Sequence, residues 1–246
     1  MMKDPKERFS ETADAYGKYR PSYPPALVEW VLRTAGVLPP SWIGDVGCGT
    51  GISTRLFAER GFHVVGIDPN EQMLRLAAAH GGRFVRAEAS ATALREAGLG
   101  LVVSGQAFHW FDLATVMPEL RRVLRPRGTV AAFWNRRAST PFLEEYERLL
   151  RTHSTEYGNI PGPRETIPRI KASSHVTDLR EAEFENAQEF DLDGVIGRAR
   201  SSSYVIHGVA DLPAFERALA EAFGRHERGG KVTFAYRSVV VAWRLA

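Results

Sequence analysis

A turn with three glycines at every second position constrains the fold of this chain more than any other feature. The stretch Trp42–Gly51 runs from apolar residues through Asp45 to glycines at positions 47, 49 and 51, and a helix-like segment begins at Ile52. Glycine is favoured where the backbone takes positive φ or must come close to a ligand. The pattern therefore predicts a buried strand, a tight turn and a helix whose first N–H groups face an acceptor.

The glycine spacing separates the candidate ligand classes. A dinucleotide site uses the pattern G-x-G-x-x-G and holds a diphosphate on the helix N-terminus. Here Ile52 stands where the third glycine would fall, and Asp45 beside the turn would repel a diphosphate. No Gly-Lys-Ser/Thr follows, so a P-loop is excluded. A ligand that carries an amino group suits this turn better.

A second strand supplies the next part of the pattern. Val64-Val65-Gly66-Ile67-Asp68 ends in a carboxylate 21 residues beyond Gly47, the distance at which an acidic residue meets ribose hydroxyls in a βαβ nucleotide site. Together the Asp45-to-Gly51 turn and this strand resemble the cofactor site of class I S-adenosylmethionine (SAM)-dependent methyltransferases. A nicotinamide-dependent (NAD) dehydrogenase and a SAM-binding module without turnover remain the alternatives.

Two further segments resemble the small-molecule subgroup that includes trans-aconitate methyltransferase. One is the string from Gln106 to Asp112, Gln-Ala-Phe-His-Trp-Phe-Asp. The other is the N-terminal run Phe9–Pro24, which in that subgroup forms a lid over the SAM site. The resemblance implies that Tyr16 and Arg20 approach the cofactor's carboxylate or the substrate.

The resemblance also implies a set of cofactor contacts. Asp45 and the glycine turn would hold the methionine moiety, Asp68 the ribose and Glu88 the adenine. Cys48 is expected to be a small residue of the turn and not a nucleophile, because the sequence places no base beside it. The predicted cofactor-binding residues are Tyr16, Arg20, Asp45, Gly47, Cys48, Gly49, Gly51, Asp68, Pro69, Met73, Glu88, Ala89, Gln106 and Trp110.

Methyl transfer from SAM is an in-line displacement that leaves S-adenosyl-L-homocysteine, so the protein's main task is alignment. His109 is the candidate catalytic residue, as a general base; the alternative is a hydrogen-bonded packing residue beside Trp110. The seven histidines show no metal-ligand spacing, and no metal is predicted.

The methyl acceptor is expected to be a small molecule, with a carboxylate as the candidate group. Four arginines are candidates for an anion pocket: Arg20, Arg198, Arg200 and Arg237. The alternative is that they are paired or solvated surface charges. The run from Ser201 to Tyr204 resembles the subgroup's substrate-side helix end, so some of its residues are expected to line the pocket.

Composition limits the other partners. A net charge of +3 without a dense Lys/Arg run gives no support for a nucleic-acid face. No apolar run of ~18 residues indicates a membrane span, and a single cysteine excludes internal disulfides. We expect a cytoplasmic monomer or homodimer with no membrane partner.

The predicted fold is a single α/β methyltransferase domain over residues 1–246. Alternating strands and helices indicate a parallel, doubly wound, Rossmann-like sheet. The resemblance implies seven strands in the order 3-2-1-4-5-7-6, with strand 7 antiparallel. The expected parts are an N-terminal lid (1–35), a SAM-binding core (36–135), an insertion or cap (136–182) and C-terminal strands and helices (183–246). Residues 153–174 are expected to be a mobile loop over the site.

Overall fold

The computed structural model describes residues 17–159 and 162–246, and Tyr16 lies outside them. The chain divides into two compact units. The glycine-loop unit comprises Ser22–Asn135, Pro161–Phe184 and Ser238–Ala246. The arginine unit comprises Met1–Pro21, Arg136–Ile160 and Glu185–Arg237. The predicted cap at 136–182 is therefore shared between the two units.

The elements follow the predicted alternation of strands and helices. The glycine-loop unit holds α2 (Pro25–Ala35), β1 (Trp42–Val46), α3 (Ile52–Ala58), β2 (His63–Asp68), α4 (Glu71–Ala78), β3 (Arg83–Arg86), β4 (Leu99–Gly105), η2 (Phe108–Trp110), α5 (Leu113–Val123) and α7 (Pro163–Lys171). The arginine unit holds α6 (Pro141–His153), η3 (Tyr157–Asn159), α8 (Leu192–Arg200), α9 (Ser203–Ile206) and α10 (Leu212–His226). Three strands contribute residues to both units: β5 (Leu124–Arg137), β6 (Val176–Phe190) and β7 (Val232–Leu245).

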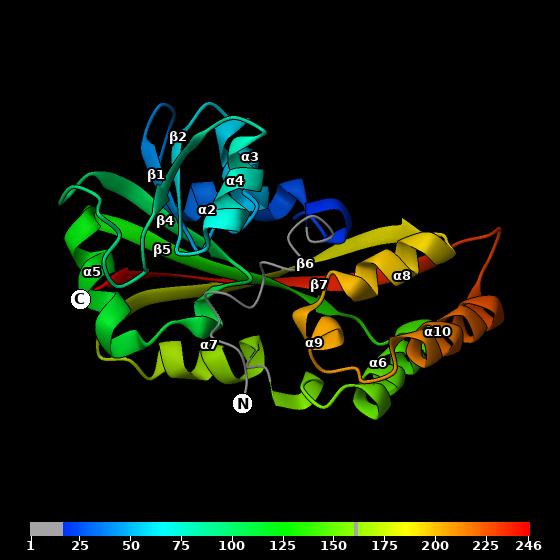
Figure 1. The fold of residues 1–246 in the computed structure, drawn as a ribbon. Helices are drawn as coiled ribbons and strands as arrows, with labels where there is room; N and C mark the ends of the chain where they lie inside the picture. The colour runs from blue at the N-terminus through cyan, green and yellow to red at the C-terminus, as the bar shows by residue number, and fades with distance from the viewer. Residues whose placement is uncertain (1–16, 160–161) are drawn as a thin grey trace. The chain divides into compact units, whose positions relative to one another are not determined.

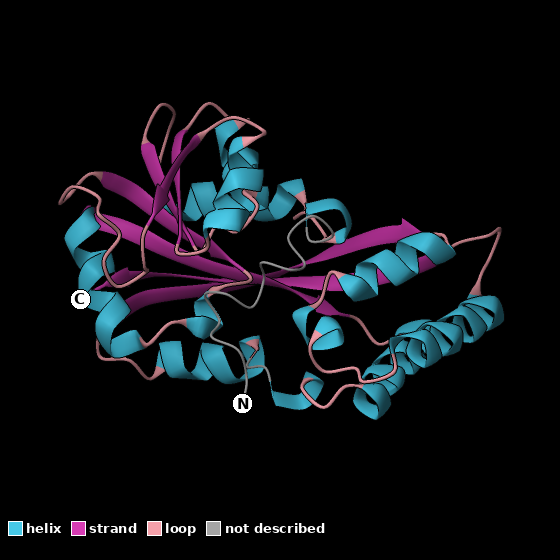
Figure 2. Ribbon diagram, viewed as in Figure 1, coloured by secondary structure: helices cyan, strands magenta, loops and turns pink. Residues whose placement is uncertain are grey.

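The strands form one seven-stranded sheet in the order β3-β2-β1-β4-β5-β7-β6, drawn in magenta in Figure 2. Neighbours from β3 to β5 are parallel, with Asp45 opposite Gly66 on one side and Val103 on the other. Strand β7 is antiparallel. The predicted fold class and strand order are confirmed.

Both faces of the sheet are buried in the glycine-loop unit. Along β5, Val130, Ala132 and Trp134 belong to the cluster that includes α5 and Ile170 of α7. Ala131 and Phe133 point the other way and join the cluster that includes α2 and α3. Side chains of a strand alternate between faces, so a strand covered on both sides must be apolar throughout. This explains the continuous apolar runs in the sequence.

The arginine unit has a core of its own. Helices α6 and α10 lie side by side in Figure 1 and contact each other along their lengths. Tyr146 of α6, Phe215 of α10 and Phe234 of β7 are fully buried in this core, together with Val195 of α8. The aromatic rings of Tyr146 and Phe234 meet edge to face, with centroids 5.1 Å apart.

The predicted loop at 153–174 is wrong over most of its length, because it contains η3 and the nine-residue helix α7. Its prolines favour a loop by composition, but Pro163 occupies the first helical turn, where a missing N–H costs nothing. The Glu165 carboxylate accepts a hydrogen bond from the Gly162 N–H at 2.9 Å. Ile170 is fully buried and anchors the helix on the core.

One boundary also differs from the prediction. Strand β6 begins at Val176, well before the predicted 183, because its charged, outward-facing residues hide the strand pattern on this edge of the sheet. Helix α4 is capped by Asn70, whose side chain accepts from the Met73 N–H at 3.0 Å. Asp68 therefore ends β2 and does not cap the helix.

No helix within residues 17–159 and 162–246 has the length and apolar character needed to cross a membrane.

Candidate functional site

The candidate site lies where parallel strands of the glycine-loop unit end. The glycine loop, defined here as residues 47–51, follows β1; Asp68 ends β2; and Gln106 follows β4. The carboxyl ends of parallel strands meet at one edge of a sheet, which is where open α/β folds bind ligands. The topology therefore brings three separate segments of the sequence to one edge.

The loop's shape depends on its glycines. Gly47, Gly49 and Gly51 all have positive φ, at 73°, 52° and 75°. A Cβ on Gly47 would lie 2.5 Å from the Cβ of Ala107, so the loop packs closely on the segment after β4. A Cβ on Gly49 would have nothing within 4 Å. Backbone is therefore exposed to open space at the centre of the loop, as a ligand would require.

Asp68 connects the loop to the second strand. Its Oδ2 accepts from the Gly49 N–H at 2.9 Å, and its Oδ1 accepts from the Asn70 N–H at 2.8 Å. Burial raises the pKa of Asp68, while these two N–H groups oppose the rise. Each carboxylate oxygen retains a lone pair after accepting one bond, so Asp68 can accept hydroxyl hydrogens as well.

Asp45 is fully buried beneath the loop. Its Oδ2 accepts hydrogen bonds from the hydroxyls of Ser53 at 2.7 Å and Thr54 at 2.6 Å. Its Oδ1 is buried and makes no hydrogen bond with the described residues. Burial raises the pKa of Asp45 to about 6, although the two hydroxyls act in the opposite direction. A buried acceptor without a donor indicates a site for a donor supplied by a ligand.

The other residues predicted beside the cofactor have varied surroundings. Cys48 and Met73 are buried, at 6% and 3% exposed, and burial raises the pKa of the Cys48 thiol. Pro69 and Ala89 are half-buried, and Glu88 is exposed. Cys48 is thus an inert residue of the loop, as expected for a thiol that burial keeps protonated. The predicted adenine contact of Glu88 stays a prediction.

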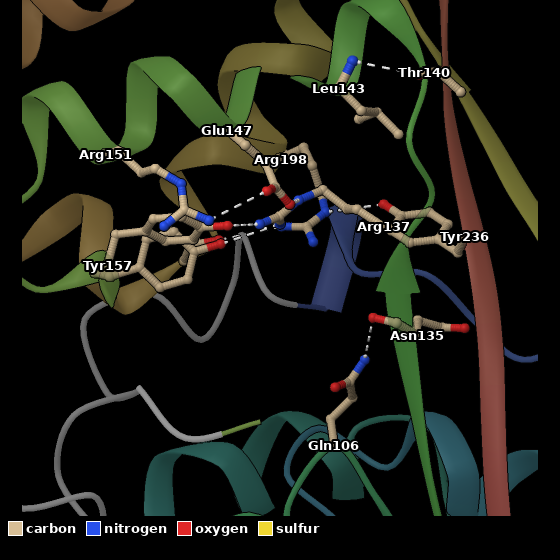
Figure 3. A network of polar contacts seen from close by, with 12 residues as sticks. Gln106, Asn135, Arg137, Thr140, Leu143, Glu147, Arg151, Tyr157, Arg198 and Tyr236 are labelled. Atoms are coloured by element: carbon tan, nitrogen blue, oxygen red, sulfur yellow. Dashed lines mark hydrogen bonds and ion pairs between the residues drawn. The ribbon is translucent and has the colours of Figure 1, made fainter. Parts of the chain in front are cut away.

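The segment after β4 places Gln106 and the aromatic residues of η2. Gln106 has a φ of 59°, and its side-chain N–H donates to the backbone oxygen of Asn135 at 3.4 Å (Figure 3). Trp110 is half-buried at the end of η2. Its ring centroid lies 4.8 Å from that of His109. The predicted string therefore forms one short turn beside the glycine loop.

The contacts of His109 speak against the general base predicted from the sequence. Its Nδ1 accepts the indole N–H of Trp134 at 3.1 Å, so the neutral ring carries its proton on Nε2. Burial lowers the pKa of His109 to about 4. Both ring nitrogens are thus occupied at neutral pH, one by the indole and one by a proton. The alternative interpretation, a hydrogen-bonded packing residue, fits these contacts better.

The four arginines predicted to form an anion pocket separate into two pairs. Arg200 forms a bidentate ion pair with Glu216, and Arg237 pairs with the exposed Glu185 at 3.0 Å. For these two, the alternative interpretation of paired surface charges fits the contacts better. Arg20 and Arg198 instead meet at the turn after α8, where both donate to the hydroxyl of Ser202 at 3.2 Å.

Sequence reasoning missed Arg137, the last residue of β5. It donates from Nε to Glu147 at 3.1 Å and from Nη2 to the hydroxyl of Tyr157 at 2.5 Å. Figure 3 shows Arg137 and Arg198 pointing into the same cluster of the arginine unit. Its position at the carboxyl end of a strand, where ligands bind in open α/β sheets, was the available signal.

The residues of the glycine loop fit the cofactor that the sequence predicts. An exposed loop backbone, a buried carboxylate oxygen without a donor and a carboxylate at the end of β2 suit a ligand with an amino group and a ribose. Within residues 17–159 and 162–246, no three His, Cys, Asp or Glu side chains gather as metal ligands would.

Comparisons with known proteins agree with this geometry. Residues 44–132 match a family model described as a methyltransferase domain. An uncharacterized methyltransferase of Mycobacterium tuberculosis is 37% identical over 131 residues, 52% of each chain. The chain thus spans about half the length of the curated relatives it matches.

Solved structures extend the likeness beyond the matched segment. A structure from Anaeromyxobacter dehalogenans that bears the name of a type II methyltransferase has a TM-score of 0.69 and 28% identity, covering 92% of this chain and 98% of its own. A phosphoethanolamine-type N-methyltransferase of Haemonchus contortus, solved with S-adenosylhomocysteine, shares the fold at a TM-score of 0.58 and 13% identity, covering 98% of this chain and 58% of its own. Residues 44–132 of this chain thus resemble a methyltransferase domain, and the likeness to the Anaeromyxobacter structure extends over most of the chain.

Proposed function

We propose that this protein transfers a methyl group from SAM to a small-molecule acceptor, with a carboxylate oxygen as the acceptor atom. The observation that carries the proposal is the glycine loop: its central backbone faces open space, and its Gly49 N–H is bonded to Asp68. The match of residues 44–132 to a methyltransferase domain supports the reaction class.

The charges at the loop favour SAM over a dinucleotide. Asp45 and Asp68 bring two carboxylates to the glycine loop, and each raises the pKa of a neighbouring acid or thiol. A diphosphate would add negative charge to this region, whereas SAM brings an ammonium and a sulfonium. We assign Asp45 to the amino-acid end of the cofactor and Asp68 to its ribose hydroxyls. Glu88 is the proposed partner of the adenine amine.

The bound cofactor would supply an electrophilic methyl group on sulfur. The residues of this chain then hold the cofactor, align the acceptor with the methyl and exclude water, and such alignment can contribute roughly 7–11 kcal/mol. Trp110 offers an aromatic face beside the loop, where a ring can stabilise a cation. Arg20 remains a proposed contact of either the cofactor's carboxylate or the substrate.

The state of His109 supports an acceptor that needs no base. A phenol or an amine must lose a proton during methyl transfer, and that step is commonly assisted by a basic side chain. His109 already accepts a hydrogen bond at Nδ1 and has a pKa of about 4. A carboxylate is already ionised at neutral pH and can attack the methyl directly.

Calorimetric titration of the protein with SAM and with NAD tests the cofactor assignment. We expect SAM to bind and NAD not to bind; the reverse result would refute the proposal. Incubation with methyl-labelled SAM and a metabolite mixture then tests turnover. The expected product is a labelled methyl ester that releases its label as methanol on mild alkaline treatment, because methyl esters hydrolyse readily. Binding without any labelled product would favour a module that holds SAM without turnover.

Asp68→Asn tests the ribose assignment. The amide has one acceptor oxygen where the carboxylate has two, so it cannot accept from both ribose hydroxyls and from the Gly49 N–H as the carboxylate does. We therefore expect SAM affinity to fall about tenfold. Glu71→Gln is the matched control, because Glu71 is exposed at the start of α4 and pairs with Arg75 and Arg86. Equal SAM affinity in the wild type and in Asp68→Asn would remove Asp68 from the site.

A further inference from the structure

The arginine unit contains a cluster of buried positive charge that the proposed cofactor site does not use. Arg198 of α8 is only 3% exposed, and the side chain of Arg137 at the end of β5 is 13% exposed. Burial and the nearby charge of Arg137 both act to lower the pKa of Arg198, although the surrounding tyrosines raise it overall. Figure 3 shows both side chains directed into the same region.

Too few negative charges accompany these arginines in the described part of the chain. Arg198 donates only to neutral oxygens: the hydroxyl of Tyr236 at 3.4 Å and those of Ser201 and Ser202 at 3.3 and 3.2 Å. Arg137 has one carboxylate, Glu147, which it shares with the exposed Arg151. Buried charges are normally paired, because removing an ion from water is costly. The cluster thus has an excess of positive charge.

Unused hydrogen-bond donors lie in the same cluster. The described bonds of Arg198 use Nε and Nη1 and leave Nη2 without one. The hydroxyl of Tyr146 is fully buried and has no hydrogen-bond partner among the described residues. The Tyr146 ring lies 5.5 Å from the Arg137 guanidinium carbon. A buried hydroxyl of this kind normally has a partner, so its lack of one indicates a missing acceptor.

We propose that Arg137, Arg198 and the Tyr146 hydroxyl form a binding site for a small oxyanion, a carboxylate or a phosphate. An oxyanion supplies the negative charge and the acceptor oxygens that the cluster lacks. The guanidinium fork binds either group through paired N–H···O bonds. The site takes an oxyanion whether or not that molecule accepts a methyl group, so this proposal goes beyond the function proposed above.

When it is ionised, the phenol of Tyr204 supplies negative charge to the arginines from within the protein and so competes with an external anion. Burial alone would raise its pKa, but the guanidinium groups of Arg137, Arg198 and Arg20 outweigh burial and lower the pKa of Tyr204 to about 7. Arg137 donates to this hydroxyl at a long 3.4 Å. At pH 6 the phenol is mostly neutral, so the positive charge of the arginines is then available to an external anion.

The test is calorimetric titration of the full chain, without SAM, at pH 6, using succinate, tricarballylate and inorganic phosphate as separate probes. We expect at least one probe to bind with one site per chain at sub-millimolar to millimolar concentrations. Arg198→Met should weaken that binding about tenfold or more. Arg200→Met is the matched control, because Arg200 is on the same helix but is paired with Glu216 at the surface. The affinity of this variant for the anion probe should equal that of the wild type.

If Arg198→Met does not fold, Tyr146→Phe tests the anion site independently. This change removes a hydroxyl that has no described partner, so the free protein should be as stable as the wild type or slightly more stable. Anion affinity should nevertheless fall about threefold to tenfold. Circular dichroism melts establish folding for each variant. The proposal is overturned if no probe binds the wild type, or if folded Tyr146→Phe and Arg198→Met bind the probes as tightly as the wild type does.

Discussion

The glycine loop and the arginine cluster are both buried and charged, but they differ in sign and in construction. The loop unit buries the acid Asp45 and supplies it with two hydroxyls from the next helix. The arginine unit buries Arg137 and Arg198 with mostly neutral partners drawn from several elements. The first is compact in sequence, over positions 45–68; the second collects residues between positions 137 and 236.

This difference indicates complementary ligands. A region of buried acids with an open backbone favours a cationic cofactor, and a region of buried guanidinium groups favours an anion. The difference also explains why the net charge of +3 says little about the ligands, because it sums over two regions of opposite charge. Substitutions in each region test this difference, and the largest effect is expected at the glycine loop.

Gly47→Ala should destabilise the protein most. The new Cβ would lie 2.5 Å from the Cβ of Ala107, on a backbone with φ of 73°. Left-handed backbone and overpacking together predict a loss of about 2–4 kcal/mol in the free energy of unfolding. Gly49→Ala is the control, because its Cβ meets nothing within 4 Å, and we expect only about 1–2 kcal/mol there. Urea unfolding measures both, and equal losses would contradict the packing of the loop on the segment after β4.

Asp45→Asn should stabilise the cofactor-free protein at alkaline pH. The pKa of Asp45 is raised by burial to about 6, so the folded protein binds the proton more tightly than the unfolded chain does. The wild type therefore loses stability from this group as pH rises from about 4 through 6. The variant has no charge to bury, and we expect it to be about 1–3 kcal/mol more stable at pH 8 but little changed at pH 4.

The same variant should bind SAM more weakly, because the amide has lost the charge that attracts the cofactor's amino group. Thermal unfolding over a pH series, with and without SAM, measures both effects. A stability difference that does not depend on pH would show that Asp45 does not titrate in this range.

Anion binding in the arginine unit should weaken as pH rises from 6 to 8. Tyr204 becomes a phenolate as pH passes through about 7, and the phenolate competes with the ligand for the guanidinium groups. The groups that face or adjoin Tyr204 are Arg20, Arg137, Arg198, Tyr146 and Tyr157, with Glu147 bound to Arg137. Affinity for succinate, expressed per dianion so that its own ionisation is removed, should fall roughly fivefold to tenfold over this range. Tyr204→Phe should flatten the dependence, and a slope that persists in this variant would assign the titration to another group.

His109→Gln should change turnover least, by less than about threefold. A glutamine can still accept the Trp134 N–H, and the histidine it replaces has a pKa of about 4 and no free lone pair at neutral pH. The pH profile of kcat between 6 and 8 should be the same in both proteins. A loss of a hundredfold with unchanged SAM affinity would restore His109 as the general base.

Much of the loop unit could be predicted from the sequence because its determinants are local. The glycine spacing specifies the turn, and the continuous apolar runs in β4 and β5 specify strands that are buried on both faces. The helix α7 could not be predicted in this way. Its prolines indicate a loop when taken alone, and only the burial of Ile170 against the sheet shows why a helix forms there.

The hydrogen-bond and ion-pair partners of each site residue could not be predicted from the sequence. The motif identified His109 as a polar residue after a strand end, but the contact with Trp134 that occupies its Nδ1 joins residues 25 positions apart. In the same way, four arginines looked equivalent in the sequence, and only the positions of Glu216 and Glu185 separate the surface pairs from the buried ones.

The sequence by itself determined the glycine loop and the carboxylate at the end of β2, because short-range spacing encodes them, and its family resemblance implied the strand order. The tertiary structure decided the protonation of Asp45 and His109 and the grouping of Arg137 with Arg198. Those properties depend on burial and on neighbours distant in the chain, and the free energy of a charge is set by what surrounds it in space.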